Sequence, residues 1–439
     1  MGKNYNQKVN VYEASKQRVD FIFKNFKRIY LSFSGGKDSG VMLNLVIDYM
    51  KQNNIKEKVG LMVMDNEANY NHSLDFMHRI VQENLDYLDV YWCCLPITLP
   101  CTVSSYATDW QCWGVDDEHR WIKPMPKNHY IVNINNHNMP FFRENMGYDE
   151  FWDKFGDWYA QGQECACLIG IRTDESLNRY RAIMNDKKGM KQGKYWTKKN
   201  TSLVYNCYPI YDWRTDDVWI ANYKFEWDYN KLYDIFYRAG LTVAQMRVAS
   251  PFMSEAKSSL NLYRVIDAEI WSRLCARVSG ANFMATYGKQ ISYKSFKLPD
   301  GHTWKSFTKF LLDTLPEETS VNFRMRFAQS LKYWWRVGRG LSETVIKDLE
   351  KNNIEFIKGA KTRHGRQDKT CVRMLPPDHL DMLKCHNSEV TSWKRFALTI
   401  LKNDHTCKYL GLAPTKEQAV RQKEIQKKYK DLPIIETKK

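Results

Sequence analysis

The chain has 439 residues, of which 43% are hydrophobic and 14% aromatic, a composition that excludes a disordered chain and predicts about two or three globular domains. It holds no run of roughly 18 apolar residues and begins without the apolar segment of a secretion signal, so we expect a cytoplasmic protein with no membrane-spanning helix. Of its net charge of +16, residues 1–250 carry almost nothing (31 basic, 30 acidic), whereas residues 251–439 hold 35 basic and 20 acidic residues, which is typical of a polyanion-binding or a solvated basic surface.

The first half alternates strand and helix patterns. Short β-branched, aromatic or apolar runs predict strands, and apolar residues at three-to-four spacing predict helices. The strands are expected at residues 28–33, 59–65, 88–95, 167–171 and 204–210, and the helices at 13–27, 41–50 and 73–85. Alternation of this kind favours an α/β fold with a parallel sheet.

After about residue 215 the pattern becomes mostly helical. Helices are expected at residues 216–223, 231–238, 257–278 and 321–338. We therefore expect an α/β domain over residues 1–245, with an insert at about 95–165, then a basic, mostly α-helical domain over 246–410. A charged helical tail is expected over 411–439.

The loop Ser34-Gly35-Gly36-Lys37-Asp38-Ser39 lies between the first strand and the next helix. Gly35 and Gly36 permit backbone angles and close approaches that let successive amides face an anion, and the helix start adds its own amides and dipole. Lys37 supplies a positive charge, Ser34 and Ser39 supply hydroxyl donors, and Asp38 is a candidate ligand for Mg²⁺. The position predicts a phosphate-binding loop.

This loop is not the Walker A pattern, because it lacks the four-residue insert before Gly-Lys. It resembles the PP-loop, Ser-Gly-Gly-x-Asp-Ser, of ATP pyrophosphatases and phosphoadenosine phosphosulfate reductases. The resemblance implies the adenine nucleotide alpha hydrolase-like (Rossmann-like) fold and binding of ATP or phosphoadenosine phosphosulfate. It also places Asp65, at the end of the second strand, beside the nucleoside.

A second motif follows the strand expected at residues 167–171. The stretch 170–179 resembles the Gly-x-Arg-x-x-Glu-Ser-x-x-Arg segment of the reductases. Arg172 and Arg179 are expected to hold an anionic phosphate or sulfate, Glu175 to orient an arginine, and Ser176 to cap the next helix. A surface salt-bridge cluster is the competing interpretation.

Five further stretches extend the likeness. Residues 209–219 resemble the family's Pro-x-x-x-Trp-x-x-x-Asp-Val-Trp element, which we interpret as mainly structural. Residues 65–68 and the aromatic-rich insert 95–126 resemble the immunoglobulin-binding regulator IbrA subgroup, as do Trp393-Lys394-Arg395 and residues 401–404. That resemblance implies a ParB-like partner protein.

The chain departs from the reductases at the catalytic cysteine. No Glu-Cys-Gly-x-His motif is present; Cys371 and Cys407 lack the Gly and His, and His386 follows Cys385 directly. We interpret most cysteines as buried, inert thiols, and a zinc site built from Cys371, Cys385, His386 and Cys407 stays an open alternative.

Two functions from different classes fit these features. The first is an ATP pyrophosphatase or adenylyltransferase with Mg²⁺ on Asp38, in which Lys37, Arg172 and Arg179 neutralise developing phosphate charge. The second is a non-catalytic nucleotide sensor that binds DNA or a partner protein. A transferase or reductase acting on phosphoadenosine phosphosulfate is a third possibility.

The basic second half offers two candidate nucleic-acid contacts. The helix expected over residues 323–340 carries Arg324, Arg326, Trp334 and Trp335, which are suited to phosphates and unpaired bases but equally to a protein core. Residues 358–369 are expected to form an exposed basic loop.

Overall fold

A computed structural model of the chain describes residues 9–185, 188–243, 245–253, 260–287, 296–364, 367–383 and 389–412, with the side chains of 287 and 361–368 left out. The described chain forms two compact units. Unit 1 holds the residues up to Cys101 and Asp109–Thr286, and unit 2 holds Thr102–Thr108 and the residues from Tyr287 onward.

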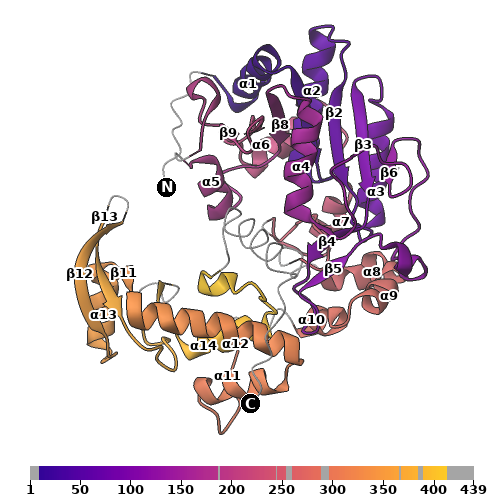
Figure 1. The fold of residues 1–439 in the computed structure, drawn as a ribbon. Coiled ribbons are helices and arrows are strands. Elements are labelled where there is room, and N and C mark those ends of the chain that lie inside the picture. Colours follow the sequence, from indigo (N-terminus) through magenta and orange to yellow (C-terminus); the bar gives the residue numbers. More distant parts are fainter. Residues whose placement is uncertain are drawn as a thin grey trace. The chain divides into compact units, whose positions relative to one another are not determined.

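Unit 1 is built on a seven-stranded sheet (Figure 1). Its strands, in spatial order, are β6 Ile131–Asn133, β3 Leu88–Cys94, β2 Val59–Met64, β1 Arg28–Phe33, β8 Cys165–Ile169, β10 Val204–Cys207 and β9 Thr197–Lys199. Every neighbouring pair is parallel except β9, which runs antiparallel to β10 at the edge. The mostly parallel α/β sheet predicted from the alternating pattern is confirmed. In such a sheet the loops after the parallel strands meet at one edge, which is where open α/β folds bind ligands.

Helices cover both faces of this sheet. The helices of unit 1 are α1 Val11–Asn25, α2 Lys37–Gln52, α3 Asn71–Gln82, α4 Tyr148–Ala160, α5 Leu177–Ile183, α6 Thr215–Lys224, α7 Leu232–Arg238, α8 Tyr263–Ile266, α9 Ala268–Arg277 and α10 Ala281–Tyr287. Phe33 on β1 packs on Phe76 of α3, and Tyr30 on the same strand packs on Phe155 of α4. Residues an odd number apart on a strand point to opposite faces, so α3 and α4 lie on opposite sides of the sheet.

Two features of unit 1 differ from the expected elements. The strand expected at residues 167–171 begins at Cys165 and ends at Ile169, so Gly170 and Ile171 belong to the loop after it. The insert contains a small sheet that the sequence patterns did not indicate, formed by β4 Ile97–Pro100, β5 Asp109–Gln111 and β7 Met146–Gly147. Its strands are two to four residues long, too short for an alternating pattern to register.

Unit 1 extends to Thr286, beyond the domain boundary expected at residue 245. Aromatic packing and a hydrogen bond hold the added helices: the ring of Tyr263 stacks on Tyr70 with centroids 3.6 Å apart, and its hydroxyl donates to the Ala68 carbonyl at 2.9 Å. These contacts join residues almost 200 positions apart, which helical periodicity alone does not reveal.

Unit 2 contains helices and a small antiparallel sheet. The helices are α11 Trp304–Thr314, α12 Glu317–Lys332, α13 Glu343–Lys351 and α14 Trp393–Leu401, and the strands are β11 Arg339–Leu341, β13 Gln367–Arg373 and β12 Ile357–His364. The helical second half is therefore confirmed, but the exposed loop expected over residues 358–369 was wrong. Residues 358–364 belong to β12 and residues 367–369 to β13, and the two strands pair with each other.

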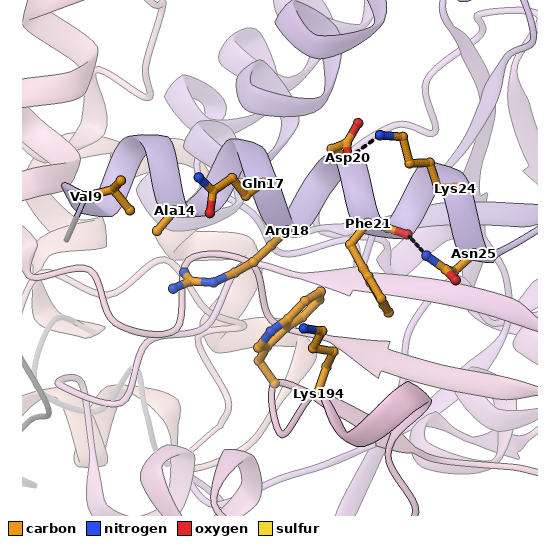
Figure 2. Close-up of a pocket in the computed structure, with 10 residues that line it drawn as sticks. Val9, Ala14, Gln17, Arg18, Asp20, Phe21, Lys24, Asn25 and Lys194 are labelled. Atoms are coloured by element: carbon orange, nitrogen blue, oxygen red, sulfur yellow. Dashed lines mark hydrogen bonds and ion pairs between the residues drawn. The ribbon is translucent and has the colours of Figure 1, made fainter. Parts of the chain in front are cut away.

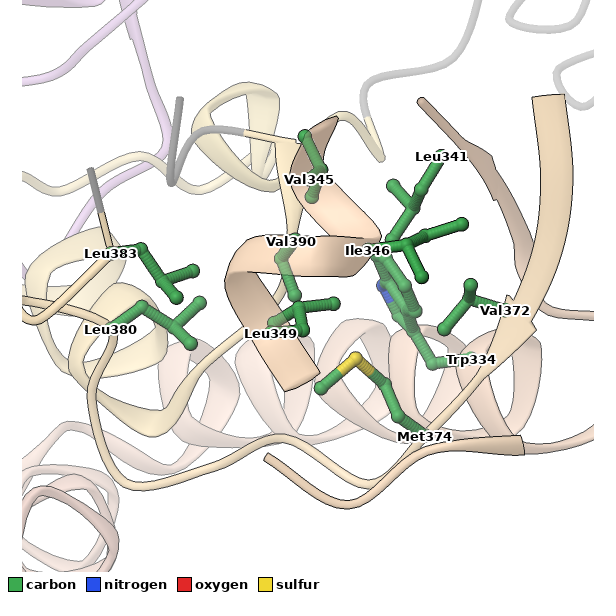
Figure 3. Packing of buried hydrophobic residues seen from close by; sticks show 10 residues of the cluster. All are labelled: Trp334, Leu341, Val345, Ile346, Leu349, Val372, Met374, Leu380, Leu383 and Val390. Carbon is green, nitrogen blue, oxygen red and sulfur yellow. The ribbon is translucent and has the colours of Figure 1, made fainter. Parts of the chain in front are cut away.

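A buried cluster holds α13 to this sheet (Figure 3). Trp334 is 4% exposed and lies among Leu341, Ile346 and Val372, so it belongs to the core of unit 2. Its neighbour Trp335 is half exposed. The helix expected over 321–338 appears as α12 followed by a π-helical turn, Tyr333–Val337. Nucleic-acid contact through this helix stays a prediction. The tail from residue 413 onward and the pair Cys385 and His386 lie outside the described residues.

Candidate functional site at the loop between β1 and α2

The predicted phosphate loop connects the end of β1 to the start of α2. Gly35 has a φ of +68°, and a Cβ there would lie 2.5 Å from the sulfur of Met77, so both backbone angle and space require glycine. The hydroxyls of Ser34 and Ser39 lie 3.0 Å apart, and Ser39 Oγ also lies 3.0 Å from the Gly36 carbonyl, to which it donates. The loop is thus held closed by its own serines.

The start of α2 faces this loop without a side-chain cap. Gly36 is the N-cap residue and offers no side chain to the first-turn amides. The Lys37 amide donates to the Tyr233 hydroxyl at 3.1 Å. The amides of Asp38 and Ser39 follow in the first turn, where a helix has no partners of its own for them. The sixteen-residue helix therefore presents its positive dipole end and two amides at the loop.

Asp38 holds two cations at once. Its Oδ1 accepts from Arg172 Nε at 2.7 Å, and its Oδ2 accepts from Lys37 Nζ at 2.9 Å. All three side chains are buried, Arg172 being only 1% exposed. Arg172 also donates to the Trp213 carbonyl and to Thr215 Oγ1. The carboxylate therefore fixes both candidate phosphate-binding cations beside the loop.

The pKa of Lys37 is lowered from its ordinary value, first because the side chain is buried and then because Arg172 and Arg179 lie near enough to repel its charge. Asp38 opposes this shift only in part. Three cations thus converge on one loop with Asp38 between two of them. An anionic ligand would relieve their mutual repulsion.

Gly170 lets the loop after β8 reach the loop after β1. A Cβ on Gly170 would lie 2.8 Å from the backbone oxygen of Asp38 and 2.9 Å from the Cα of Ser39. Backbone meets backbone at this point, so no flexible side chain is available to move aside. The glycine of the second motif is what brings Arg172 to Asp38.

The remaining residues of that motif lie only in part where the sequence predicts them. Ser176 is the N-cap of α5 and accepts from the Arg179 amide at 3.2 Å. Glu175 forms ion pairs with Arg179 and with Arg247, the latter at 3.6 Å. Arg179 is partly exposed, whereas Arg172 is buried on Asp38. Glu175 therefore pairs with two arginines, of which Arg179 lies near enough to Lys37 to act on its charge.

Residues around the start of α7 support the loop and were missed by the sequence analysis. Asn230 is fully buried, and its Nδ2 donates to the Gly35 carbonyl and to Ser73 Oγ, each at 2.9 Å. Tyr233 accepts from Lys37 through its hydroxyl, and burial raises the pKa of that phenol. Neither residue stands in a recognisable motif, and each lies almost 200 positions from its partner.

Asp65 is placed at the end of β2 but is turned into the protein. It is 2% exposed, accepting from Trp92 Nε1 at 3.0 Å and from the Glu67 amide at 2.9 Å. Burial raises its pKa. The structure thus gives Asp65 a structural contact, and the nucleoside contact implied by the resemblance stays a prediction.

Glu67, two residues further, forms a buried network that the sequence did not indicate. It has a φ of +68° and accepts from the amides of Trp113 and Ile122 at 2.8 and 2.9 Å. Arg277 of α9 donates to Glu67 at 3.2 Å and to Asp117 at 2.8 Å. Burial raises the pKa of Glu67. The pKa of Arg277 is raised by its two acidic partners, Glu67 and Asp117, against the opposing effect of burial. The network fastens the insert and α9 to the end of β2.

The cysteines of unit 1 are mostly inert. Those on β3, β8 and β10 and in the insert are buried, and burial raises the pKa of each thiol for which a shift is resolved, that of Cys167 to about 12. Thiols of this kind stay protonated and do not act as nucleophiles. Among the residues described, no cluster of three or more His, Cys, Asp or Glu is arranged to hold a metal ion.

One cavity of about 510 Å³ lies along α1 (Figure 2). Three of its charged lining residues form ion pairs: Lys24 contacts Asp20 on the same helix, and Arg18 is held by Asp212. None of its lining residues belongs to the loop between β1 and α2. Within the described residues, no helix is long and apolar enough to cross a membrane.

Comparison with known proteins supports the nucleotide-binding interpretation of unit 1. Residues 28–240 match the family model "Phosphoadenosine phosphosulfate reductase domain", and residues 240–421 match "Domain of unknown function (DUF3440)". The chain is 28% identical over 417 residues to "Uncharacterized protein YbdN" of Escherichia coli (strain K12), covering 93% of this chain and 92% of that protein.

Solved structures show only weak similarity. Candida glabrata FMN adenylyltransferase has 13% identity and a TM-score of 0.31. The match covers 51% of this chain and 59% of the adenylyltransferase chain, which is less than two thirds of that chain. The phosphoadenylyl-sulfate reductase of Candida auris has 12% identity and a TM-score of 0.26, over 53% of this chain and 94% of its own. The U34-tRNA thiolase NcsA of Methanococcus maripaludis has 16% identity and a TM-score of 0.29, over 63% and 79%. An IbrA-like subgroup is not confirmed by these matches. The family match over residues 28–240 supports the superfamily to which the loop and arginine motifs point.

Proposed function

We propose that unit 1 binds ATP by its phosphates on the loop Ser34–Ser39 and cleaves it between the α- and β-phosphates. An acceptor oxygen attacks the α-phosphorus, the bond to the bridging oxygen breaks, and pyrophosphate leaves with the electron pair while the acceptor's proton passes to solvent. The product is an adenylated acceptor.

One observation carries this proposal: Lys37, Arg172 and Arg179 converge on an uncapped helix start, and Asp38 fixes the first two there. Such an arrangement stabilises charge that develops on transferred and leaving phosphates, because the cations and amides are already in place. The partly exposed Arg179, held by Glu175, is the cation best placed to follow the departing pyrophosphate.

Adenylyl transfer is favoured over sulfonucleotide reduction by the state of the thiols. Reduction needs a thiolate nucleophile, whereas the described cysteines of the α/β sheet are buried and protonated. Phosphoadenosine phosphosulfate as a ligand, rather than as an oxidant, is compatible with the same loop. The IbrA-like subgroup and a ParB-like partner remain predictions from the sequence motifs.

Magnesium normally accompanies ATP and would neutralise phosphate charge. Asp38, its expected ligand, already offers one oxygen to Arg172 and the other to Lys37, so a metal ion bound there would share the carboxylate with two cations. We therefore assign Asp38 first to positioning those cations.

The test is pyrophosphate release from ATP labelled on the γ-phosphate, with Mg²⁺ and a panel of acceptors that includes RNA and DNA. The wild-type chain is expected to release pyrophosphate, Lys37→Ala to lose release, and Arg143→Ala, an exposed arginine paired to Glu150, to keep it. Binding without turnover in every arm would instead support the nucleotide sensor. A parallel arm with phosphoadenosine phosphosulfate separates the two nucleotides.

A further inference from the structure

A second cavity in unit 1 is lined by residues of the insert and of α9. It has a volume of about 820 Å³, within the usual range of small-molecule sites. A cavity of about 400 Å³ shares Glu118, Trp121, Met125 and Lys127 with it, so these four residues lie between or beside the two cavities. The smaller one also includes Cys94, the last residue of β3, and Asn133, the last residue of β6. The smaller cavity therefore lies at the carboxyl edge of the sheet, and the larger one adjoins it through the shared residues.

The lining of the larger cavity is mostly positively charged. Four cationic side chains, Arg120, Lys123, Lys127 and Arg273, meet a single acid, Glu118. Arg120 and Arg273 pair with Asp117 and Glu269, but these pairs are largely exposed and hold their arginines weakly. A monocarboxylate needs one such cation, whereas phosphate groups use several.

Lys123 is the buried member of this set. It is 7% exposed and donates to the Asn69 carbonyl, in the segment that follows β2. Burial lowers its pKa to about 8, although Asp65, Asp267 and Asp75 act in the opposite direction. The residue thus joins the cavity to the strand end next to the ATP loop, because β1 and β2 are neighbours.

Trp121 supplies an aromatic surface in the shared wall. Its indole nitrogen donates to the Gly114 carbonyl at 2.9 Å, and its ring meets Trp113 edge-on with centroids 5.0 Å apart. Trp113 in turn donates to the Asp65 carbonyl at 2.7 Å. The ring is therefore fixed before any ligand arrives, which lowers the entropic cost of stacking.

We propose that this cavity is a second binding site, which takes a nucleotide unit with its base on Trp121 and its phosphates on Lys123, Lys127 and Arg273. The role of that nucleotide as the acceptor of the adenylyl group rests on the proposed function; its binding does not. A free nucleotide and a nucleotide within a single strand share this chemistry.

The experiment measures the fluorescence anisotropy of a labelled oligouridylate of six nucleotides as the full-length chain is added. The ATP loop is blocked by a saturating, non-hydrolysable ATP analogue, and uridine monophosphate is the competitor. Lys127→Ala and Arg273→Ala should each weaken binding by about five- to tenfold, and Trp121→Ala by a similar factor. The control Lys154→Ala, an exposed lysine on α4 outside the lining, should change binding by less than about twofold.

If uridine monophosphate competes with the oligouridylate, a free nucleotide is sufficient as the ligand of the cavity. If it does not compete, the ligand is a nucleotide within a single strand. Absence of binding, or binding insensitive to all three lining variants, overturns the proposal. If, in the absence of the blocking analogue, only Lys37→Ala loses binding, the oligouridylate binds on the ATP loop, and this result also overturns the proposal. Binding sensitive to the lining variants in a chain that releases no pyrophosphate keeps the site and removes only the acceptor role.

Discussion

Arg172 donates from Nε to Oδ1 of Asp38 across 2.7 Å, joining the loop after β8 to the first turn of α2. Both residues are buried, and Lys37 completes the group from the other carboxylate oxygen. This contact ties two separate sequence motifs into one site, so its loss should affect folding and nucleotide binding together.

Asp38→Asn tests the anchoring role. The change leaves the buried Arg172 and Lys37 without their shared anion, and we expect a loss of about 3–5 kcal/mol in the free energy of unfolding, measured by urea denaturation. The matched control Asp20→Asn removes a largely exposed pair with Lys24 and should cost less than about 1 kcal/mol. Equal effects of the two substitutions would contradict the anchoring role.

Arg179→Ala tests the cation assigned to the leaving phosphates. Because a charged hydrogen bond to phosphate contributes about 1.5–3 kcal/mol, affinity for ATP should fall about 10- to 100-fold by calorimetry. Arg143→Ala, remote from the loop motifs, should bind ATP like the wild type. An Arg179 variant with unchanged affinity would remove this residue from the site.

Gly170→Ala tests the close approach of the two loops. The added methyl group meets the Asp38 backbone, so we expect a destabilisation of about 1–3 kcal/mol together with weaker ATP binding. Gly189→Ala is the control, because a Cβ there meets only Lys199 side-chain atoms at 3.5 Å or more. Comparable melting temperatures for the two variants would show that the approach is not tight.

The buried pair of Glu67 and Arg277 predicts strong coupling. Glu67→Gln removes one of the two acidic partners of Arg277, and Arg277→Met leaves the buried Glu67 without its cation; each should cost about 3 kcal/mol of unfolding free energy. The double variant should cost clearly less than the sum of the two, which a double-mutant cycle by denaturation measures. Additive costs would indicate that the two side chains act independently.

Buried thiols predict a loss of stability in alkali. Burial raises the folded-state pKa of Cys93, Cys112 and Cys165 far above the unfolded value of 9.0. Above pH 9 the unfolded chain releases thiol protons that the folded chain keeps, so the free energy of unfolding must fall as pH rises. Denaturation at pH 8 and pH 10 should show this fall, and Cys165→Ala should make it shallower. A stability that is flat or rising over that interval would contradict the assigned burial.

Much of the candidate site could be predicted from the sequence because its parts are adjacent in the chain. The strand, glycine turn and helix around Gly35 follow from residues adjacent in the chain, and so does the Ser176 cap. The residues that contact those parts from elsewhere in the chain could not be predicted from the sequence. Tyr233 and Asn230 reach the loop from almost 200 positions away, and no periodic pattern encodes which backbone group a buried side chain contacts.

The same distinction explains the elements that were missed. The helix expected over residues 257–278 appears, where it is described, as a short 3-10 turn at Leu260–Leu262 followed by α8 and α9. The contact of α9 with the end of β2 includes the pairing of Arg277 with Glu67, 210 positions apart. Strands β12 and β13 carry polar residues without apolar alternation, so pairing of their backbones, rather than burial of one face, defines them.

The most direct measurement is a calorimetric titration of the wild-type chain and of Lys37→Ala with an ATP analogue that has a methylene bridge between its α- and β-phosphates. If the loop between β1 and α2 binds the phosphates, the wild type will give a saturable one-to-one heat, and the variant will bind about tenfold more weakly or worse. No heat with the wild-type chain, or equal affinity in the two proteins, would contradict the account.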